Sequence, residues 1–185
     1  MSISKQKLLL HCCCAPCACY VIEHLLPKYD ITLLFYNPNI EPYDEYIKRK
    51  NEVIKYIDAA SFTSEVKILE CEYDNAVFTE SALSLREEPE GGARCRKCFE
   101  IRLYETANRA SDGRYDIFAS TLSVSPHKNA AVINEIGLSA AIKYDIAYLP
   151  SDFKKNDGYK RSTELSKTYG LYRQNYCGCQ LRQPK

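Results

Sequence analysis

Most of the ten cysteines in this chain are bunched rather than scattered. Thiolates are soft ligands that suit zinc and iron–sulfur clusters, and pairs of thiols exchange two electrons through a disulfide. Bunching therefore predicts metal or redox chemistry. The three groups are Cys12, Cys13, Cys14, Cys17 and Cys19 near the start, the pair Cys95 and Cys98, and the pair Cys177 and Cys179, while Cys71 stands alone.

Two C-x-x-C pairs, Cys14 with Cys17 and Cys95 with Cys98, have the spacing of a four-thiolate metal centre. Spacing alone leaves a structural zinc ion and an iron–sulfur cluster equally open. Two features favour the cluster. The pairs are about 80 residues apart with predicted strands and helices between them, whereas a zinc ribbon staples one short local unit. The surplus thiols also suggest an open coordination position or a second metal ion, as in catalytic centres.

The C-terminal pair, Cys177-Gly178-Cys179, predicts a different device. A disulfide across one intervening residue closes a small, strained ring, so it should be easy to reduce. Gly178 supplies the backbone freedom that such a turn needs. We interpret this pair as a two-electron thiol–disulfide relay, with a further pair of metal ligands as the alternative.

Histidines are the other candidates for this chemistry, because their ordinary pKa lies near neutrality. His127 lies in a loop beside Lys128, after a predicted strand, and is the better candidate for a proton donor. His11 ends the first predicted strand, where a ligand, a proton donor and a structural residue are all open interpretations.

Alternating strands and helices must position these residues. Apolar periodicity predicts five strands, at 7–11, 30–37, 66–70, 115–120 and 145–149. It predicts helices at 18–26, 43–60, 75–84, 99–110, 129–138 and 163–169. This alternation indicates an α/β fold with a mainly parallel sheet covered by helices on both faces. Ligands bind such sheets beyond the carboxyl ends of the strands, where the first cysteine group and His127 fall.

Length and composition indicate one globular domain over residues 1–185. The chain has 185 residues, of which 45% are hydrophobic and 26% charged, which excludes a disordered or fibrous protein. A net charge of +1 excludes a uniformly basic nucleic-acid coat. No apolar run approaches the roughly 18 residues of a membrane span, and no signal peptide is apparent. We therefore expect a cytoplasmic protein without a membrane partner.

Charge is unevenly distributed along the chain. Residues 151–185 form a basic, Tyr-rich segment with a net charge of +5 and four tyrosines, whereas the rest of the chain carries −4. Basic side chains bind phosphates and aromatic rings stack on bases, so RNA binding is one interpretation. Composition alone favours the other, a solvated tail whose tyrosines pack on the core.

Four motifs resemble those of the QueH-type epoxyqueuosine reductases, and they spread from residue 8 to residue 179. The last is long and idiosyncratic, which makes the resemblance specific. It implies a single Rossmann-like (HUP-like) domain that reduces the epoxide of epoxyqueuosine in a tRNA anticodon loop to the alkene, giving queuosine. The motifs are His11-Cys12-Cys13-Cys14-Ala15-Pro16-Cys17, Asn37-Pro38-Asn39-Ile40, Arg94-Cys95-Arg96-Lys97-Cys98-Phe99, and the run from Gly158-Tyr159-Lys160-Arg161-Ser162 through Tyr172-Arg173-Gln174-Asn175-Tyr176-Cys177-Gly178-Cys179.

The resemblance also implies cofactors and site residues. It places the ligands of a four-iron, four-sulfur (4Fe–4S) cluster at Cys13, Cys14, Cys95 and Cys98. Cys17 then becomes the candidate ligand of an adjacent mononuclear metal ion, iron or zinc, although spacing alone pairs it with Cys14. The redox-active disulfide of the family corresponds to Cys177 and Cys179. Such a reductase needs an external electron donor.

The resemblance gives the basic C-terminal segment a role as the surface for the anticodon loop. Its candidate RNA-binding residues are Lys160, Arg161, Tyr172 and Arg173. Three alternatives stay open. A zinc-stapled RNA-binding module leaves the surplus cysteines unexplained, and a thiol–disulfide oxidoreductase needs only the C-terminal pair. An iron–sulfur tRNA sulfurtransferase needs a phosphate-binding loop after the first strand, where this chain has cysteines.

Overall fold

Five parallel strands form the sheet of this chain, whose computed structural model describes residues 5–181. The order in the sheet is β3-β2-β1-β4-β5, with parallel pairing throughout. This order matches the first five strands of the doubly wound Rossmann sheet, which confirms the predicted α/β fold. The strands are β1 (Gln6–His11), β2 (Tyr29–Leu34), β3 (Val66–Leu69), β4 (Ile117–Ser120) and β5 (Ala147–Tyr148).

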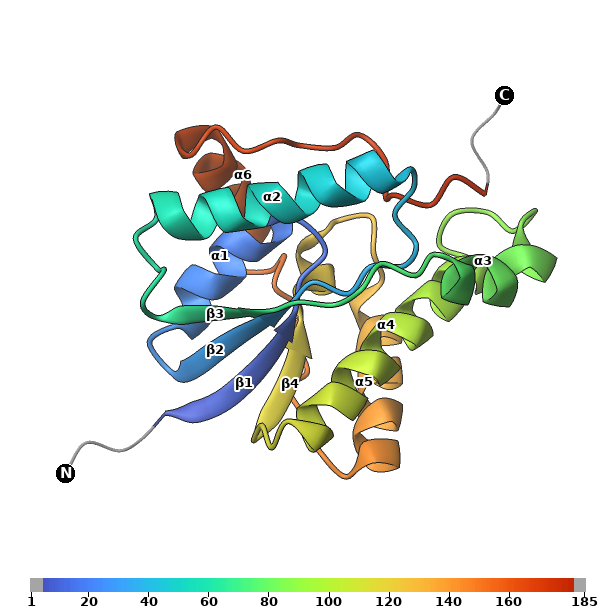
Figure 1. Ribbon diagram of the computed structural model, residues 1–185, viewed down its shortest axis with the longest axis horizontal. Helices are drawn as coiled ribbons and strands as arrows, with labels where there is room; N and C mark the ends of the chain where they lie inside the picture. Colours follow the sequence, from blue (N-terminus) through green and yellow to red (C-terminus); the bar gives the residue numbers. More distant parts are fainter. Residues whose placement is uncertain (1–4, 182–185) are drawn as a thin grey trace.

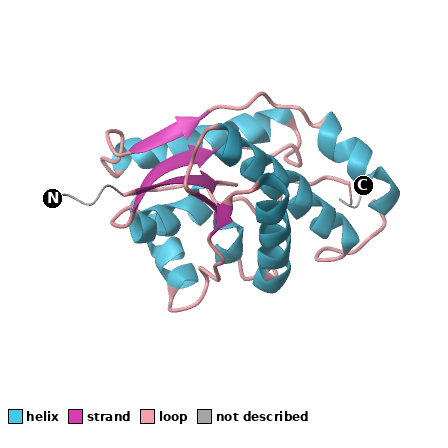
Figure 2. Cartoon of the chain, turned by 90° about the horizontal axis from the view of Figure 1, so that it is seen from below, coloured by secondary structure: helices cyan, strands magenta, loops and turns pink. Residues whose placement is uncertain are grey.

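Helices cover both faces of the sheet (Figures 1 and 2). On one face α1, α2 and α6 contribute to a shared apolar core, and on the other face α4 and α5 do so. The helices are α1 (Ala15–Leu25), α2 (Tyr43–Ala59), α3 (Ala76–Ala82), α4 (Ala93–Asp112), α5 (Ala130–Tyr144) and α6 (Gly158–Thr168), with short 3-10 turns η1 (Leu83–Leu85) and η2 (Thr121–Val124). No helix within residues 5–181 is long and apolar enough to cross a membrane.

The central strand β1 shows why this sequence forms a two-sided sheet. Leu8 and Leu10 pack toward α1 and α2, whereas Leu9 packs toward α4 and α5. All three side chains are fully buried. A strand that is covered on both faces reads as a continuous apolar run rather than an alternating one, and the run Leu8–Leu10 has this form.

Two helix starts differ from the prediction by five residues or more. The helix predicted from residue 99 begins at Ala93, and the helix predicted from residue 163 begins at Gly158. The first turns of both helices are rich in Arg and Lys, so apolar periodicity does not reveal them. The earlier start of α4 matters for the site, because it moves Cys95 and Cys98 from a loop into a helix.

The strand order reverses at β1. From β1 the chain moves outward to β2 and β3, and then returns to place β4 on the other side of β1. His11 and Ser120, the last residues of β1 and β4, are paired neighbours in the sheet. In doubly wound sheets the ligand crevice opens beyond the carboxyl ends of the strands at this reversal. The fold therefore directs attention to the segments that follow His11 and Ser120.

Candidate active site

Three thiols gather in the segment that follows β1. Cys13 and Cys14 lie between β1 and α1, and Cys17 lies in the first turn of α1. Their sulfur atoms all lie within 4.8 Å of one another. A proline occupies this first turn at no cost in hydrogen bonds, because N–H groups there have no partner within the helix. The end of β1 thus presents an all-sulfur ligand group, which suits a soft metal centre.

Protons are shared within this thiol group. Hydrogen bonds from Cys14 and then Cys17 hold the pKa of Cys13 well below its usual range. The same contacts with Cys13 raise the pKa of Cys14 to about 12 and also raise the pKa of Cys17. Cys13 is therefore the thiol of this group that ionises most readily, and a metal cation bound among the three would favour the thiolate form of each.

The second cysteine pair lies at the start of α4. Cys95 and Cys98 are three residues apart, so they share one face of the helix. The Gly91 N–H donates to the Cys95 sulfur at 3.2 Å. One turn beyond Cys98, the Arg102 guanidinium donates to the Cys98 sulfur at 3.6 Å. Both sulfurs already accept N–H bonds, which is the kind of support that orients metal-bound thiolates.

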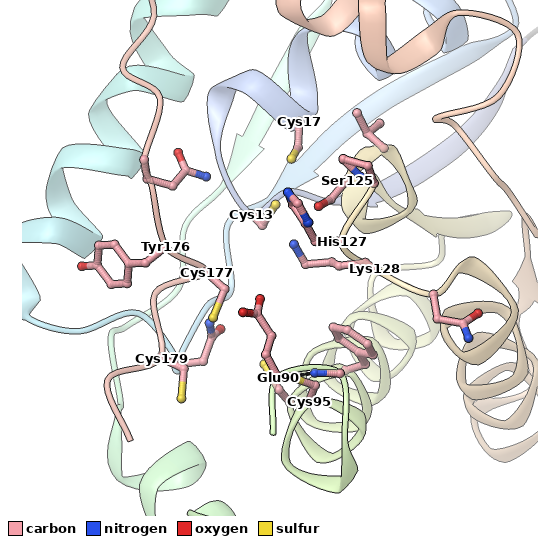
Figure 3. A pocket seen from close by; sticks show the side chains of 18 of the residues that line it. Cys13, Cys17, Glu90, Cys95, Ser125, His127, Lys128, Tyr176, Cys177 and Cys179 are labelled. Atoms are coloured by element: carbon pink, nitrogen blue, oxygen red, sulfur yellow. Dashed lines mark hydrogen bonds between the residues drawn. The ribbon is translucent and has the colours of Figure 1, made fainter. Parts of the chain in front are cut away.

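A cavity of about 840 Å³ lies between these two cysteine groups (Figure 3). Its wall comes from the segment after β1, the segment after β2, the start of α4, the loop after η2 and the C-terminal segment. The structure brings all seven predicted site cysteines to this cavity or beside it. Cys13, Cys17, Cys95, Cys98, Cys177 and Cys179 line it, and the sulfur of Cys14 lies 3.8 Å from that of Cys13.

The cavity also offers unused hydrogen-bond acceptors. Asn39 and Gln174 both line it. Their side-chain oxygens are buried and have no hydrogen-bond partner among the described residues. Buried polar atoms are nearly always paired in folded proteins. Two unpaired acceptors therefore lie in the wall of the cavity, and a small shift of either side chain would let it accept from a bound N–H or O–H group.

Residues 172–180, which we call the C-terminal strap, carry Cys177 and Cys179 to the cavity along α2 (Figure 1). The buried Arg49 of α2 donates to the carbonyls of Cys177 and Tyr176 at 3.1 and 3.2 Å. The Gly178 carbonyl accepts from the backbone N–H of Glu41 at 2.9 Å. Gly178 has φ +112°, and a Cβ there would lie 2.8 Å from an isoleucine carbon, so the strap requires glycine at this point.

Charged side chains face the cavity from opposite walls (Figure 3). The loop after η2 supplies His127, which is exposed, and Lys128, which is half-buried. Burial lowers the pKa of Lys128, whereas the nearby thiols of Cys13 and Cys17 raise it by more, so the pKa of Lys128 lies above its ordinary value. Glu90 projects into the space between Lys128 and Cys177. A ligand in this cavity meets an ammonium, an imidazole and a carboxylate.

Known proteins are similar in sequence to nearly the whole chain. Residues 8–184 match the family model described as epoxyqueuosine reductase QueH. The chain belongs to this family. It is 45% identical to the epoxyqueuosine reductase QueH of Streptococcus pyogenes serotype M1, over 95% of this chain and 69% of that protein. The corresponding protein of Staphylococcus epidermidis is also 45% identical, over 95% of this chain and 75% of its own length, and that of Thermotoga maritima is 36% identical over 92% and 87%.

Among the predicted RNA-binding residues of this QueH-family chain, Arg173 lines the cavity, at its C-terminal wall. Lys160 and Arg161 lie in the first turn of α6 with exposed side chains, away from the cavity lining. Arg161 forms an ion pair with Glu23 at 2.9 Å. The Tyr172 hydroxyl donates to a carboxylate of α2 at 3.2 Å, so this tyrosine is packed against the fold. Residues 182–185 of the basic segment lie outside the described residues.

His11 is a structural residue in this QueH-family fold. Its side chain is fully buried, with Nδ1 2.9 Å from the Ser120 hydroxyl and Nε2 3.1 Å from the Tyr36 carbonyl oxygen. Burial first, and the charge of Arg102 second, lower the pKa of His11 to about 3. The imidazole is therefore neutral, and its contacts join the ends of β1, β2 and β4.

Sequence reasoning missed Arg102, which contacts both His11 and Cys98. One signal was available, because Arg102 follows Cys98 by four residues and therefore shares its helix face. Its contacts with Asn37 and His11 carried no such signal, since those residues are 65 and 91 positions away.

Proposed function

We propose that this chain reduces the epoxide of epoxyqueuosine in a tRNA anticodon loop to the alkene, which makes it an oxidoreductase of queuosine biosynthesis. The reaction takes up two electrons and two protons, breaks both C–O bonds of the epoxide, forms a C=C bond and releases water. Membership of the family supports this function. The observation that carries it is the meeting of two cysteine groups and the C-terminal C-x-C pair around one cavity.

The donor chemistry around the cavity suits a 4Fe–4S cluster. Its proposed ligands are Cys13, Cys14, Cys95 and Cys98, an all-sulfur set of the kind that such clusters use. The buried guanidinium of Arg102 on α4 has no carboxylate partner among the described residues, which also suits a bound anionic group. When bound, the cluster supplies electrons one at a time, and an adjacent iron or zinc ion on Cys17 would act as a Lewis acid at the epoxide oxygen.

Side chains of the chain itself would bind the substrate and supply protons. The unpaired oxygens of Asn39 and Gln174 would accept N–H bonds from a nucleobase once their side chains turn toward the cavity. His127 is the proposed proton donor to the departing oxygen, and the Lys128 ammonium stabilises negative charge beside the thiol group. The 840 Å³ cavity is in the size range of small-molecule sites and admits an extruded nucleoside.

Cys177 and Cys179 form the proposed two-electron store. Oxidation of the two thiols to a disulfide releases two electrons and two protons, the number that the epoxide consumes. Cys177 is exposed and Cys179 is half-buried, so an external donor can reach the pair to reduce it again. The partners of this chain are then a tRNA that carries epoxyqueuosine and a separate electron carrier.

The test is anaerobic purification followed by iron and sulfide analysis and an assay on epoxyqueuosine-containing tRNA. We expect about four irons and four sulfides per chain, and conversion to queuosine. Cys95→Ala and Cys98→Ala should each lose the cluster and the activity. Cys71→Ala is the matched control, because Cys71 is half-buried and lies outside the cavity lining. Colourless protein with one zinc ion and no sulfide would refute the proposal in favour of a zinc-stapled RNA-binding module.

A further inference from the structure

A buried cation lies behind the proposed cluster ligands. The guanidinium of Arg102 belongs to α4, and the residue is only 3% exposed. Among residues 5–181, no carboxylate lies within ion-pair distance of it. Burying a charge without a counter-charge is strongly unfavourable. The counter-charge of Arg102 must therefore come from a group other than a carboxylate.

The contacts of Arg102 hold its planar fork in one position. Nη2 donates to the Asn37 side-chain oxygen at 2.8 Å, and the Asn37 amide donates in turn to the Cys12 carbonyl at 2.9 Å. Nε lies 3.3 Å from Nε2 of His11. Neither of these partners, an amide and an imidazole, carries a negative charge. They orient the guanidinium without neutralising it.

The remaining contact of the fork is with sulfur. Nη1 donates to the sulfur of Cys98 at 3.6 Å. The thiol of Cys98 becomes anionic when it binds a metal. The counter-charge of Arg102 therefore lies on the metal-binding thiolates.

We propose that Arg102 is a positioning residue that raises the reduction potential of the cluster through an N–H···S bond to Cys98. This inference rests on the proposed function, because it takes Cys98 as a cluster ligand. Reduction adds one negative charge to the cluster and its thiolates. A fixed cation and a hydrogen bond at a ligand sulfur stabilise the reduced state more than the oxidised state.

The test is an anaerobic redox titration of the purified holoprotein, followed by electron paramagnetic resonance. Arg102→Met keeps an unbranched apolar chain but removes the charge and the donor. We expect it to disfavour reduction by at least tenfold, which corresponds to a shift of about 59 mV toward more negative potential. Arg102→Lys restores the charge without the fork, and we expect a smaller shift of about threefold.

The matched control is Arg109→Met, two turns further along α4. Arg109 pairs with Glu105 at 2.6 Å and lies outside the cavity lining, so its removal should leave the potential and the spectrum unchanged. Iron and sulfide analysis of each variant distinguishes loss of the cluster from a change in its reduction potential. A wild-type protein without iron and sulfide would instead contradict the proposed function itself.

A clear result would overturn the inference. An Arg102→Met variant with full iron content and the wild-type potential would show that this arginine serves packing alone. If Arg102→Met does not take up a cluster, Arg102→Lys decides the matter. A wild-type potential in Arg102→Lys would refute the hydrogen-bonded fork, and a threefold shift would support it.

Discussion

Removal of the Arg173 charge should weaken tRNA binding in a salt-dependent way. Arg173 is exposed on the C-terminal strap and lines the cavity, and its nearest polar contact is the Thr163 hydroxyl at 3.5 Å. No carboxylate among the described residues pairs with it. Its guanidinium is therefore available to a phosphate of an RNA loop that enters the cavity.

The magnitude follows from counterion release. Each phosphate contact on a single strand contributes about 0.7 to the slope of log affinity against log salt. If Arg173 contacts one phosphate, Arg173→Gln should flatten the slope by about 0.7. Between 50 and 200 mM salt, the difference in affinity between the wild type and the variant should then shrink by roughly 2.6-fold.

The assay is fluorescence anisotropy with a labelled anticodon stem-loop at several salt concentrations. The matched control is Arg161→Gln, because Arg161 already forms an ion pair with Glu23 and lies outside the cavity lining. Its slope should change by much less than that of Arg173→Gln. Equal slopes for the wild type and Arg173→Gln would remove Arg173 from the RNA surface. A larger change in the Arg161 variant would move that surface to α6.

Two further predictions concern the strap and the packing of α5. Arg49→Met should keep the iron content but lower turnover, because two hydrogen bonds to carbonyls of the strap are lost. The loosened strap should also let Cys177 react faster with an alkylating agent. Unchanged alkylation with full turnover would contradict this prediction. Gly137→Ala should lower the free energy of unfolding by about 1–2 kcal/mol. The Cβ of the new alanine would lie 2.3 Å from the Tyr148 ring, and this overpacking outweighs the gain of about 1 kcal/mol in helix propensity. Urea denaturation measures this change, and an equally stable variant would show that Tyr148 moves aside freely.

Sequence patterns predicted the fold well, because strands and helices can be recognised by the local periodicity of apolar residues. The run of leucines in β1 and the amphipathic face of α2 are properties of neighbouring residues. The start of α4 was missed for a physical reason. Its first turn contains Arg94, Arg96 and Lys97, so no apolar repeat marks it, and the helix begins where Gly92 takes an extended backbone conformation.

The candidate site was predictable in part. Strand ends in a doubly wound sheet meet at one edge, so the positions of the first cysteine group and His127 could be inferred from topology. The supports of the site could not be inferred, because they depend on residues far apart in sequence. The contacts of Arg102 with His11 and of Arg49 with Tyr176 span 91 and 127 residues. Such pairs leave no periodic trace in a single sequence.

The folded helices hold the thiols of the site in place. Cys17 lies in the first turn of α1, and Cys95 and Cys98 lie in the first turns of α4. Both helices pack against the sheet through buried cores on opposite faces. The strand order places β4 beside β1, so the sulfur of Cys13 lies 3.8 Å from the hydroxyl of Thr121, which follows β4. The position of the cavity between the thiols therefore follows from the strand order. Ligands held by rigid elements need little reorganisation when charge changes, which suits a centre that transfers electrons.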